Sequence, residues 1–105
     1  MLKFEDFTKL EIKIGTVKEA ERVEGTDRLL KVTVDMGTEE RQVVAGFGHK
    51  YSPEDLIGKQ VPIVLNIEPA IIKGVESQGI FIALQDDEPV LLLPEKKVSN
   101  GAIVK

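Results

Sequence analysis

Short apolar runs with a side-chain period of two, separated by glycine, proline and acidic turns, dominate this 105-residue chain. Because successive side chains of a strand point to opposite faces, such alternation is typical of a strand that is buried on one side. Residues 29–36 give the clearest example. The apolar face of this run carries Leu30, Val32, Val34 and Met36, and the polar face carries Lys31, Thr33 and Asp35. We therefore expect an all-β protein.

Four further runs predict strands, and no segment is repeated along the chain. A turn at residues 35–38 is expected to join the run described above to the next one as a hairpin. The additional strands are predicted at residues 12–23, 41–45, 60–67 and 79–85. The expected buried faces are Val61, Ile63, Leu65 and Ile67 in the fourth strand, and Ile80, Ile82 and Leu84 in the fifth.

The first strand, residues 12–23, changes the parity of its alternation near its start. Ile12 and Ile14 lie on one face, but Val17 lies on the other. Gly15 stands at the change, and a glycine inside a strand often marks a bulge. We expect a glycine bulge at this position.

One short helix is predicted between the third and fourth strands, at residues 52–58. Ser52 is suited to the N-cap, and Pro53 at the first helical position loses no useful donor. Acidic residues follow in the first turn, where they interact favourably with the helix dipole, and Gly58 can end the helix. The helix is expected to be one or two turns long.

Three strands, a short helix and two more strands is the order of the five-stranded OB-fold barrel, in which closure removes exposed sheet edges. A length of 105 residues with 42% hydrophobic content is enough for one core and too little for two. We expect a single OB-fold domain over residues 1–105 with terminal extensions. A small open sandwich is the alternative topology.

Both ends of the chain carry apolar residues that a five-stranded barrel does not need. Residues 90–93 are apolar on both faces, and Phe4 and Phe7 pose the same question at the other end. A two-fold homodimer is the expected answer, since such dimers are the commonest oligomers. Packing of the tail on its own barrel is the alternative.

Composition excludes most enzyme classes. The chain has no cysteine, and its one histidine, His49, has no second histidine or spaced carboxylate pair nearby, so no metal or other cofactor is expected. Ser77 lacks a Gly-x-Ser-x-Gly context, residues 46–48 lack the third glycine of a dinucleotide loop, and the acidic pairs at 39–40 and 86–87 are expected to be solvated turns. We expect a non-catalytic protein.

The remaining composition concerns location and charge. No apolar stretch approaches the length of a membrane helix, and residues 1–9 lack the pattern of a signal peptide, so we expect a cytoplasmic protein without a membrane partner. The net charge of −4 repels phosphates at long range. Any nucleic-acid site must therefore be local.

Polar groups with an unusual placement flank the predicted last two strands. Asn66 interrupts the fourth strand, and Ser77 and Gln78 directly precede the fifth, so all three are expected at one end of the barrel. The loop between them, residues 69–76, carries Ile71 and Ile72 beside Lys73, whereas loops are usually polar. In an OB-fold this loop flanks the nucleic-acid face. We expect the same groove to be faced by three further residues, Lys31 and Thr33 of the second strand and Arg41 of the third. The alternative for each of them is an ordinary solvated position on a strand. The alternative for Asn66 is a side chain that stabilises a turn.

The same segments resemble a known family over residues 4–85. They resemble the tRNA-binding domain found at the C-terminus, or as the separate β subunit, of methionyl-tRNA synthetases. Similar domains occur in stand-alone dimeric tRNA-binding proteins, in the endothelial-monocyte-activating polypeptide group and in a chaperone-like secretion protein. The matching segments are residues 12–17 (IKIGTV), 27–32 (DRLLKV), 34–37 (VDMG), 41–46 (RQVVAG), 51–58 (YSPEDLIG), 66–69 (NIEP) and 74–79 (GVESQG).

The resemblance implies an OB-fold that binds tRNA by shape and backbone, usually as a homodimer, with a methionyl-tRNA synthetase catalytic subunit as a further partner. Two departures matter: many relatives have a basic residue where Glu68 stands and a methionine where Ile80 stands. A peptide or unfolded-protein binder, using residues 71–72 and 90–93, is the alternative function. The RNA contacts that the resemblance implies are Asn66, Lys73, Ser77 and Gln78, with Lys31 and Arg41 as weaker candidates.

Overall fold

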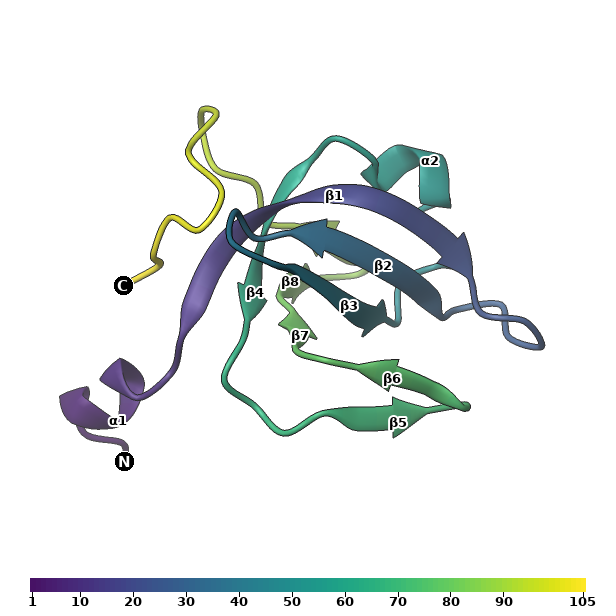
Figure 1. Ribbon diagram of the computed structural model, residues 1–105. Coiled ribbons are helices and arrows are strands. Elements are labelled where there is room, and N and C mark those ends of the chain that lie inside the picture. The colour runs from purple at the N-terminus through teal and green to yellow at the C-terminus, as the bar shows by residue number, and fades with distance from the viewer.

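The computed structural model describes residues 1–105 and is mostly β, built around one five-stranded antiparallel sheet with the order β3-β2-β1-β4-β7 (Figure 1). The segment directly before β7 meets the other outer strand, β3, where the Gln78 N–H donates to the Gln42 C=O at 2.7 Å, so the sheet is nearly closed. This is the predicted OB-fold barrel. Its strands are β1 (Ile12–Arg22), β2 (Leu30–Asp35), β3 (Glu40–Ala45), β4 (Gln60–Val64) and β7 (Ile80–Phe81).

The other elements are short and surround the barrel. Helix α2 (Pro53–Leu56) lies between β3 and β4 as predicted, and α1 (Phe4–Thr8) precedes β1. Two small hairpins complete the chain. One consists of β5 (Ala70–Ile72) and β6 (Val75–Ser77), and the other of β8 (Ala83–Gln85) and β9 (Pro89–Leu91).

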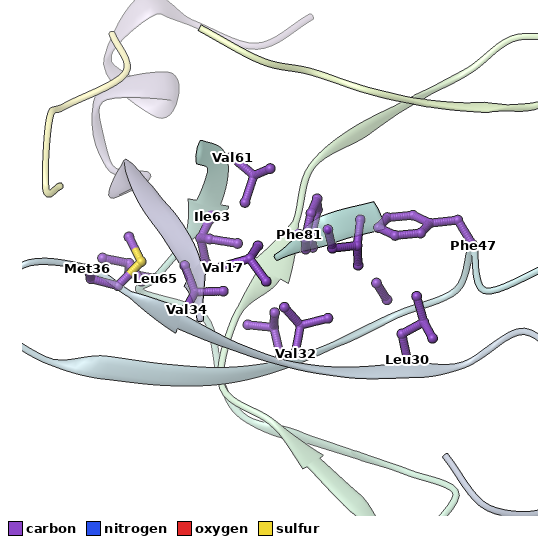
Figure 2. Packing of buried hydrophobic residues seen from close by; sticks show 13 residues of the cluster. Val17, Leu30, Val32, Val34, Met36, Phe47, Val61, Ile63, Leu65 and Phe81 are labelled. Atoms are coloured by element: carbon purple, nitrogen blue, oxygen red, sulfur yellow. The ribbon is translucent and has the colours of Figure 1, made fainter. Parts of the chain in front are cut away.

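The barrel interior is one apolar cluster (Figure 2). The predicted buried face of β2 is confirmed, since Leu30, Val32 and Val34 are fully buried and Met36 nearly so. The rings of Phe47 and Phe81 meet edge to face at 5.0 Å. Burial of each large apolar side chain of this cluster stabilises the fold by about 1.5–3 kcal/mol. The cluster comprises Val17, Leu30, Val32, Val34, Met36, Val43, Ala45, Phe47, Leu56, Val61, Ile63, Leu65 and Phe81.

The prediction of a glycine bulge at Gly15 is wrong. The pairing of β1 with β4 is regular across Gly15, and the irregularity of β1 lies against β2, between Val17 and Glu19. Gly15 instead permits close packing, because a Cβ there would lie 2.5 Å from Met36 Sδ. The parity changes because β1 is buried on both faces: Val17 belongs to the central cluster, whereas Ile12 and Ile14 are buried outside it.

The predicted fourth strand is too long at its end. Val61, Ile63 and Leu65 are buried as expected, but the strand ends at Val64, and Ile67 is exposed. The following segment, 69–76, is not an irregular loop but the hairpin of β5 and β6.

The predicted face of the fifth strand is wrong. Phe81 points into the barrel, while Ile80 and Leu84 are exposed, and the strand is broken into β7 and β8. Gly79 shows why this parity is preferred. A Cβ on Gly79 would lie 2.6 Å from the Val64 carbonyl oxygen and 3.2 Å from Ile63 Cγ2. Only glycine therefore fits at this position, two residues before Phe81 on the same face of the strand.

The C-terminal segment packs on its own barrel. Its backbone runs along β1, with hydrogen bonds from the Ile14 N–H to the Ala102 C=O and from the Val104 N–H to the Ile12 C=O, both at 2.9 Å. Leu91 packs against the central cluster, but Val90 and Leu93 of the run at 90–93 stay exposed. The backbone of the tail thus follows the alternative of packing on its own barrel.

Candidate nucleic-acid interface

The outer face of β2 and β3 lies between two projecting segments, the loop at residues 23–29 and the β5–β6 hairpin (Figure 1). OB-folds bind oligonucleotides on this face, between the loop joining strands one and two and the loop joining strands four and five. Here the β5–β6 hairpin is the second of these loops. The outer face of β2 and β3 is therefore the candidate interface.

The tip of the β5–β6 hairpin presents Lys73. Both Lys73 (φ 50°) and Gly74 (φ 81°) have left-handed backbone conformations, as a type I′ turn requires. Lys73 is exposed and belongs to none of the chain's ion pairs. Its ammonium group is therefore free to meet a phosphate.

Ser77 and Gln78 attach this hairpin to β3. The buried Ser77 Oγ accepts a hydrogen bond from the Val44 N–H at 2.9 Å and donates to the Gly79 C=O at 3.0 Å. Gln78 Oε1 accepts from the Gln42 N–H at 3.0 Å. Side chains thus replace the missing backbone partners along the open edge of β3, and both residues are used inside the chain.

Arg41, near the start of β3, contacts the same junction. Its Nη1 donates to the Leu65 C=O at 3.0 Å and to the Gln78 C=O at 2.9 Å, and its Nε lies 2.6 Å from Glu39 Oε1. The hydrogen bond from this guanidinium lowers the pKa of the Glu39 carboxyl. Arg41 therefore connects β3, the end of β4 and the segment before β7.

Arg41 does not share a face with Lys31, contrary to the expectation. Arg41 pairs with the buried Val34, whereas Lys31 pairs with Val44. Cross-strand partners lie on the same face of a sheet, so Arg41 belongs to the inner face and Lys31 to the outer one. Lys31 itself is half-exposed and forms an ion pair with Glu21 at 2.6 Å.

Asn66 lies at the predicted end of the barrel, but its side chain points to the N-terminal segment. Its Oδ1 accepts from the Glu11 N–H at 2.6 Å, and its Nδ2 donates to the Lys9 C=O at 2.6 Å. The amide therefore fixes the entry into β1. Its predicted contact with RNA is not tested by these bonds and stays a prediction.

The loop at 23–29 contributes a cation that the sequence did not single out. Arg28 is exposed at its end and belongs to no ion pair. Its C=O accepts the Gly48 N–H at 2.6 Å, and a Cβ on Gly48 would lie 2.7 Å from the same oxygen. Because Gly48 allows this approach, the loop is held against the segment after β3. His49, next to Gly48, is exposed.

An apolar cavity of about 260 Å³ lies between the end of β3 and the β5–β6 hairpin. Its lining includes the buried Phe47 and Phe81 and the exposed Ile67 and Ile80. Glu68 is its one acidic residue. This cavity adjoins the Ser77 junction, and it could not be predicted from the sequence because its walls come from three separate segments.

A larger cavity of about 1060 Å³ lies elsewhere, where residues 93–100 face the start of β4. It is polar, and its lining includes Lys59, Lys96 and Lys97. Asp35 and Glu95 also line it, so its charge is mixed. We favour the smaller cavity as part of the interface, because only that cavity adjoins the hairpin that flanks the OB-fold binding face.

The structure contains no group of three or more histidine, cysteine or acidic side chains that would hold a metal ion. None of its helices has the length and apolar character needed to cross a bilayer.

The barrel, the projecting hairpin and the flanking loop define an OB-fold binding module. More narrowly, residues 12–103 match the model of the family described as "Putative tRNA binding domain", and the chain belongs to that family. The chain is 46% identical over 104 residues to the methionine–tRNA ligase of Methanococcus aeolicus, covering 99% of this chain and 16% of the ligase. It thus spans about one-sixth of that curated relative.

Solved structures agree with this assignment. The fold matches a methionyl-tRNA synthetase-related protein from Pyrococcus horikoshii with a TM-score of 0.95 and 36% identity, covering 100% of this chain and 98% of the other. It also matches the chaperone CsaA from Bacillus anthracis with a TM-score of 0.91 and 33% identity, covering 100% and 99%. The chain is therefore similar to whole small proteins as well as to one region of a ligase.

Proposed function

We propose that this chain binds tRNA by its shape and backbone, without chemistry of its own, and raises the concentration of tRNA beside a methionyl-tRNA synthetase catalytic body. The chain would act as a single domain of that enzyme or as a separate β subunit, in the cytoplasm. Two linked sites on one ligand raise apparent affinity by about 100-fold or more. Such tethering explains how a small module without catalytic groups assists an enzyme.

The observation that carries the proposal is the placement of Lys73 at the tip of the β5–β6 hairpin. The hairpin that bears it is fixed to β3 by Ser77 and Gln78, so the backbone that carries the free ammonium group has a defined position beside the OB-fold face. Lysine side chains placed in this way contact phosphates, and the β-sheet face fits a backbone without reading every base. Support also comes from the family match over residues 12–103.

This arrangement divides the proposed RNA-binding residues into two roles. We assign direct contact to Lys73 and Arg28, with Lys31 after it leaves Glu21. Ser77, Gln78, Arg41 and Asn66 hold the segments that carry those contacts.

A homodimer is part of the proposal. Helix α1 has no buried residue, and Phe4 is 86% exposed. Leu2, Phe7 and Leu10 are also exposed on this segment, which makes an apolar surface without a cover. A second copy of the chain, related by a two-fold axis, would cover both surfaces at once.

A titration of unfractionated tRNA at several salt concentrations tests the proposed function. Each phosphate that the protein neutralises contributes about −0.7 to −0.9 to the slope of log K against log salt. We expect a slope equivalent to a few phosphates and similar affinities for different tRNAs. Absent binding, or binding that salt does not change, would exclude the proposal.

The alternative function is binding of peptides or unfolded chains. Support comes from Ile71, which is 69% exposed on β5, and from the similarity to the chaperone CsaA. A competition experiment separates the two functions. A peptide binder would suppress aggregation of a denatured protein even in excess tRNA, whereas a tRNA-binding module would not.

A further inference from the structure

The floor of the apolar cavity between β3 and the β5–β6 hairpin is made of buried aromatic side chains. Phe47 and Phe81 lie on it with exposed fractions of 5% and 8%, and their rings pack edge to face. The Ser77 hydroxyl adjoins them but is saturated by Val44 and Gly79. The floor therefore offers aromatic and aliphatic surface and no free polar group.

The rim of the cavity is different, because it carries unused polar groups. Glu68 is exposed and forms no ion pair. Gly46 is also exposed, and neither its N–H nor its C=O has a hydrogen-bond partner within the chain. The site thus combines an apolar interior with unused donors and acceptors at its mouth.

We propose that this cavity receives one unpaired nucleobase of the bound RNA. The inference rests on the proposed function, and it adds a base-binding site to a surface otherwise suited to phosphates. At about 260 Å³, the cavity is smaller than the roughly 300–1,000 Å³ of a drug-sized pocket, so it holds one ring system and not a longer ligand. Proteins commonly recognise RNA through unstacked bases that enter apolar or aromatic sites.

The polar rim favours a base over an aliphatic side chain. An aliphatic side chain of a peptide would fill the interior but make no hydrogen bond to the Glu68 carboxylate or the Gly46 backbone, which would stay hydrated. A base has a flat apolar face and an edge of donors and acceptors, and it therefore matches both parts of the site.

Glu68 also predicts which bases fit. A carboxylate only accepts hydrogen bonds, and therefore it favours the amino groups of guanine, cytosine or adenine over uracil, whose one edge donor, N3–H, lies between two carbonyl oxygens that repel the carboxylate. Glu68 then acts as a specificity residue, although its charge opposes phosphates nearby.

Two cavity-filling variants test the proposal. Gly46→Leu is suitable because a Cβ at Gly46 meets no atom within 4 Å and its φ is not left-handed, and Ala70→Leu fills the same cavity from β5. Thr38→Leu is the matched control, since it adds the same side chain in the exposed turn between β2 and β3, at the other end of these strands.

The experiment combines affinity with chemical probing of tRNA by dimethyl sulfate and kethoxal, which modify unpaired Watson–Crick edges of adenine, cytosine and guanine. We expect the unmodified chain and Thr38→Leu to protect one unpaired base. Both cavity-filling variants are expected to lose that protection and bind about 5- to 100-fold more weakly, with the same salt slope.

The possible results separate this inference from the proposed function. Salt-dependent tRNA binding without a protected base, or with full affinity in both cavity-filling variants, overturns the base site and leaves the function intact. Absence of all tRNA binding by the unmodified chain overturns both. Variants that block an apolar peptide but not tRNA would show that the cavity serves a protein partner, which also contradicts the inference.

Discussion

Ser77 shows how a single side chain completes the barrel. It is 5% exposed, and its hydroxyl meets the Val44 N–H, which no strand partner reaches. The sequence identified Ser77 as unusually placed but assigned it to RNA. Its structural role could not be predicted, because the open edge of β3 exists only once distant strands have met.

Ser77→Ala is expected to destabilise the fold. Removal of the hydroxyl leaves the Val44 N–H unsatisfied, which costs about 1–3 kcal/mol. Urea denaturation should show a lower midpoint with an unchanged slope. Ser99→Ala, which changes an exposed serine without a side-chain hydrogen bond, should stay within about 0.5 kcal/mol of the parent chain. An unchanged midpoint for Ser77→Ala would contradict the role assigned here.

Lys73 combines an unusual backbone with a free charge. Few non-glycine residues other than asparagine and aspartate adopt a left-handed conformation readily. Lys73→Asn therefore removes the ammonium group and gives the Asn-Gly pair that type I′ turns prefer.

We expect Lys73→Asn to bind all tRNAs more weakly and to lower the magnitude of the salt slope by about 0.7–0.9, without loss of stability. Lys105→Asn removes the same charge from the exposed C-terminal residue and should leave the salt slope unchanged. Isothermal titration with two different tRNAs at several salt concentrations provides the comparison. Weakened binding of one tRNA alone would argue against recognition by shape.

At the scale of elements, the strands with clean alternation were predictable. β2 carries strictly alternating polar and apolar residues, and its buried face is the one expected. Residues 80–84 are apolar on both faces, and therefore their period does not indicate which face is buried. The choice depends on the close approach of Gly79 to β4, which is a tertiary contact.

The β5–β6 hairpin illustrates a second limit. Its strands have three residues each, and Lys-Gly is a weak turn signal compared with Asn-Gly. A two-stranded hairpin is marginal by itself. It forms here because Ser77, Gln78 and Gln42 attach it to β3.

Helix α2 is expected to make stability depend on pH. The Ser52 N–H donates to Asp55 Oδ2 at 2.9 Å, and this hydrogen bond lowers the pKa of Asp55. A lowered folded-state pKa means that the contribution is fully present above the ordinary value of about 4 and is lost as the pH falls through the folded value.

The free energy of unfolding of Asp55→Asn should therefore be lower than that of the parent chain at pH 7, and the two values should approach each other in acid. Chemical denaturation across this range provides the measurement. Asp87→Asn is the control, because Asp87 lies in an exposed turn without a side-chain hydrogen bond. A constant difference between Asp55→Asn and the parent chain at every pH would refute the expectation.

At the scale of the whole molecule, the uncovered apolar surface lies on the terminal segment outside the barrel. Phe4 and Phe7 belong to a helix with no buried residue (Figure 1). The double variant Phe4→Ser, Phe7→Ser should be a monomer with the thermal stability of an isolated barrel. Sedimentation equilibrium of both proteins tests this, and a parent chain that is already monomeric would exclude the dimer.

Net charge and binding face act at different ranges. The chain carries a charge of −4, but most of its acidic groups are distributed over the surface and several are neutralised in exposed ion pairs. A few free cations at fixed positions can therefore hold a phosphate backbone at short range while the whole molecule stays acidic. Composition predicted that a site must be local, but its position required the barrel.

We propose that RNA binds the outer face of β2 and β3 between the loop at 23–29 and the β5–β6 hairpin. Titration of the isotope-labelled chain with tRNA, followed by amide NMR signals, tests this most directly. We predict that the largest changes fall on Arg28, Lys31, Lys73 and their neighbours. Changes that concentrate instead around Lys96 and Lys97, with the hairpin unaffected, would place RNA at the larger cavity and exclude binding at this face.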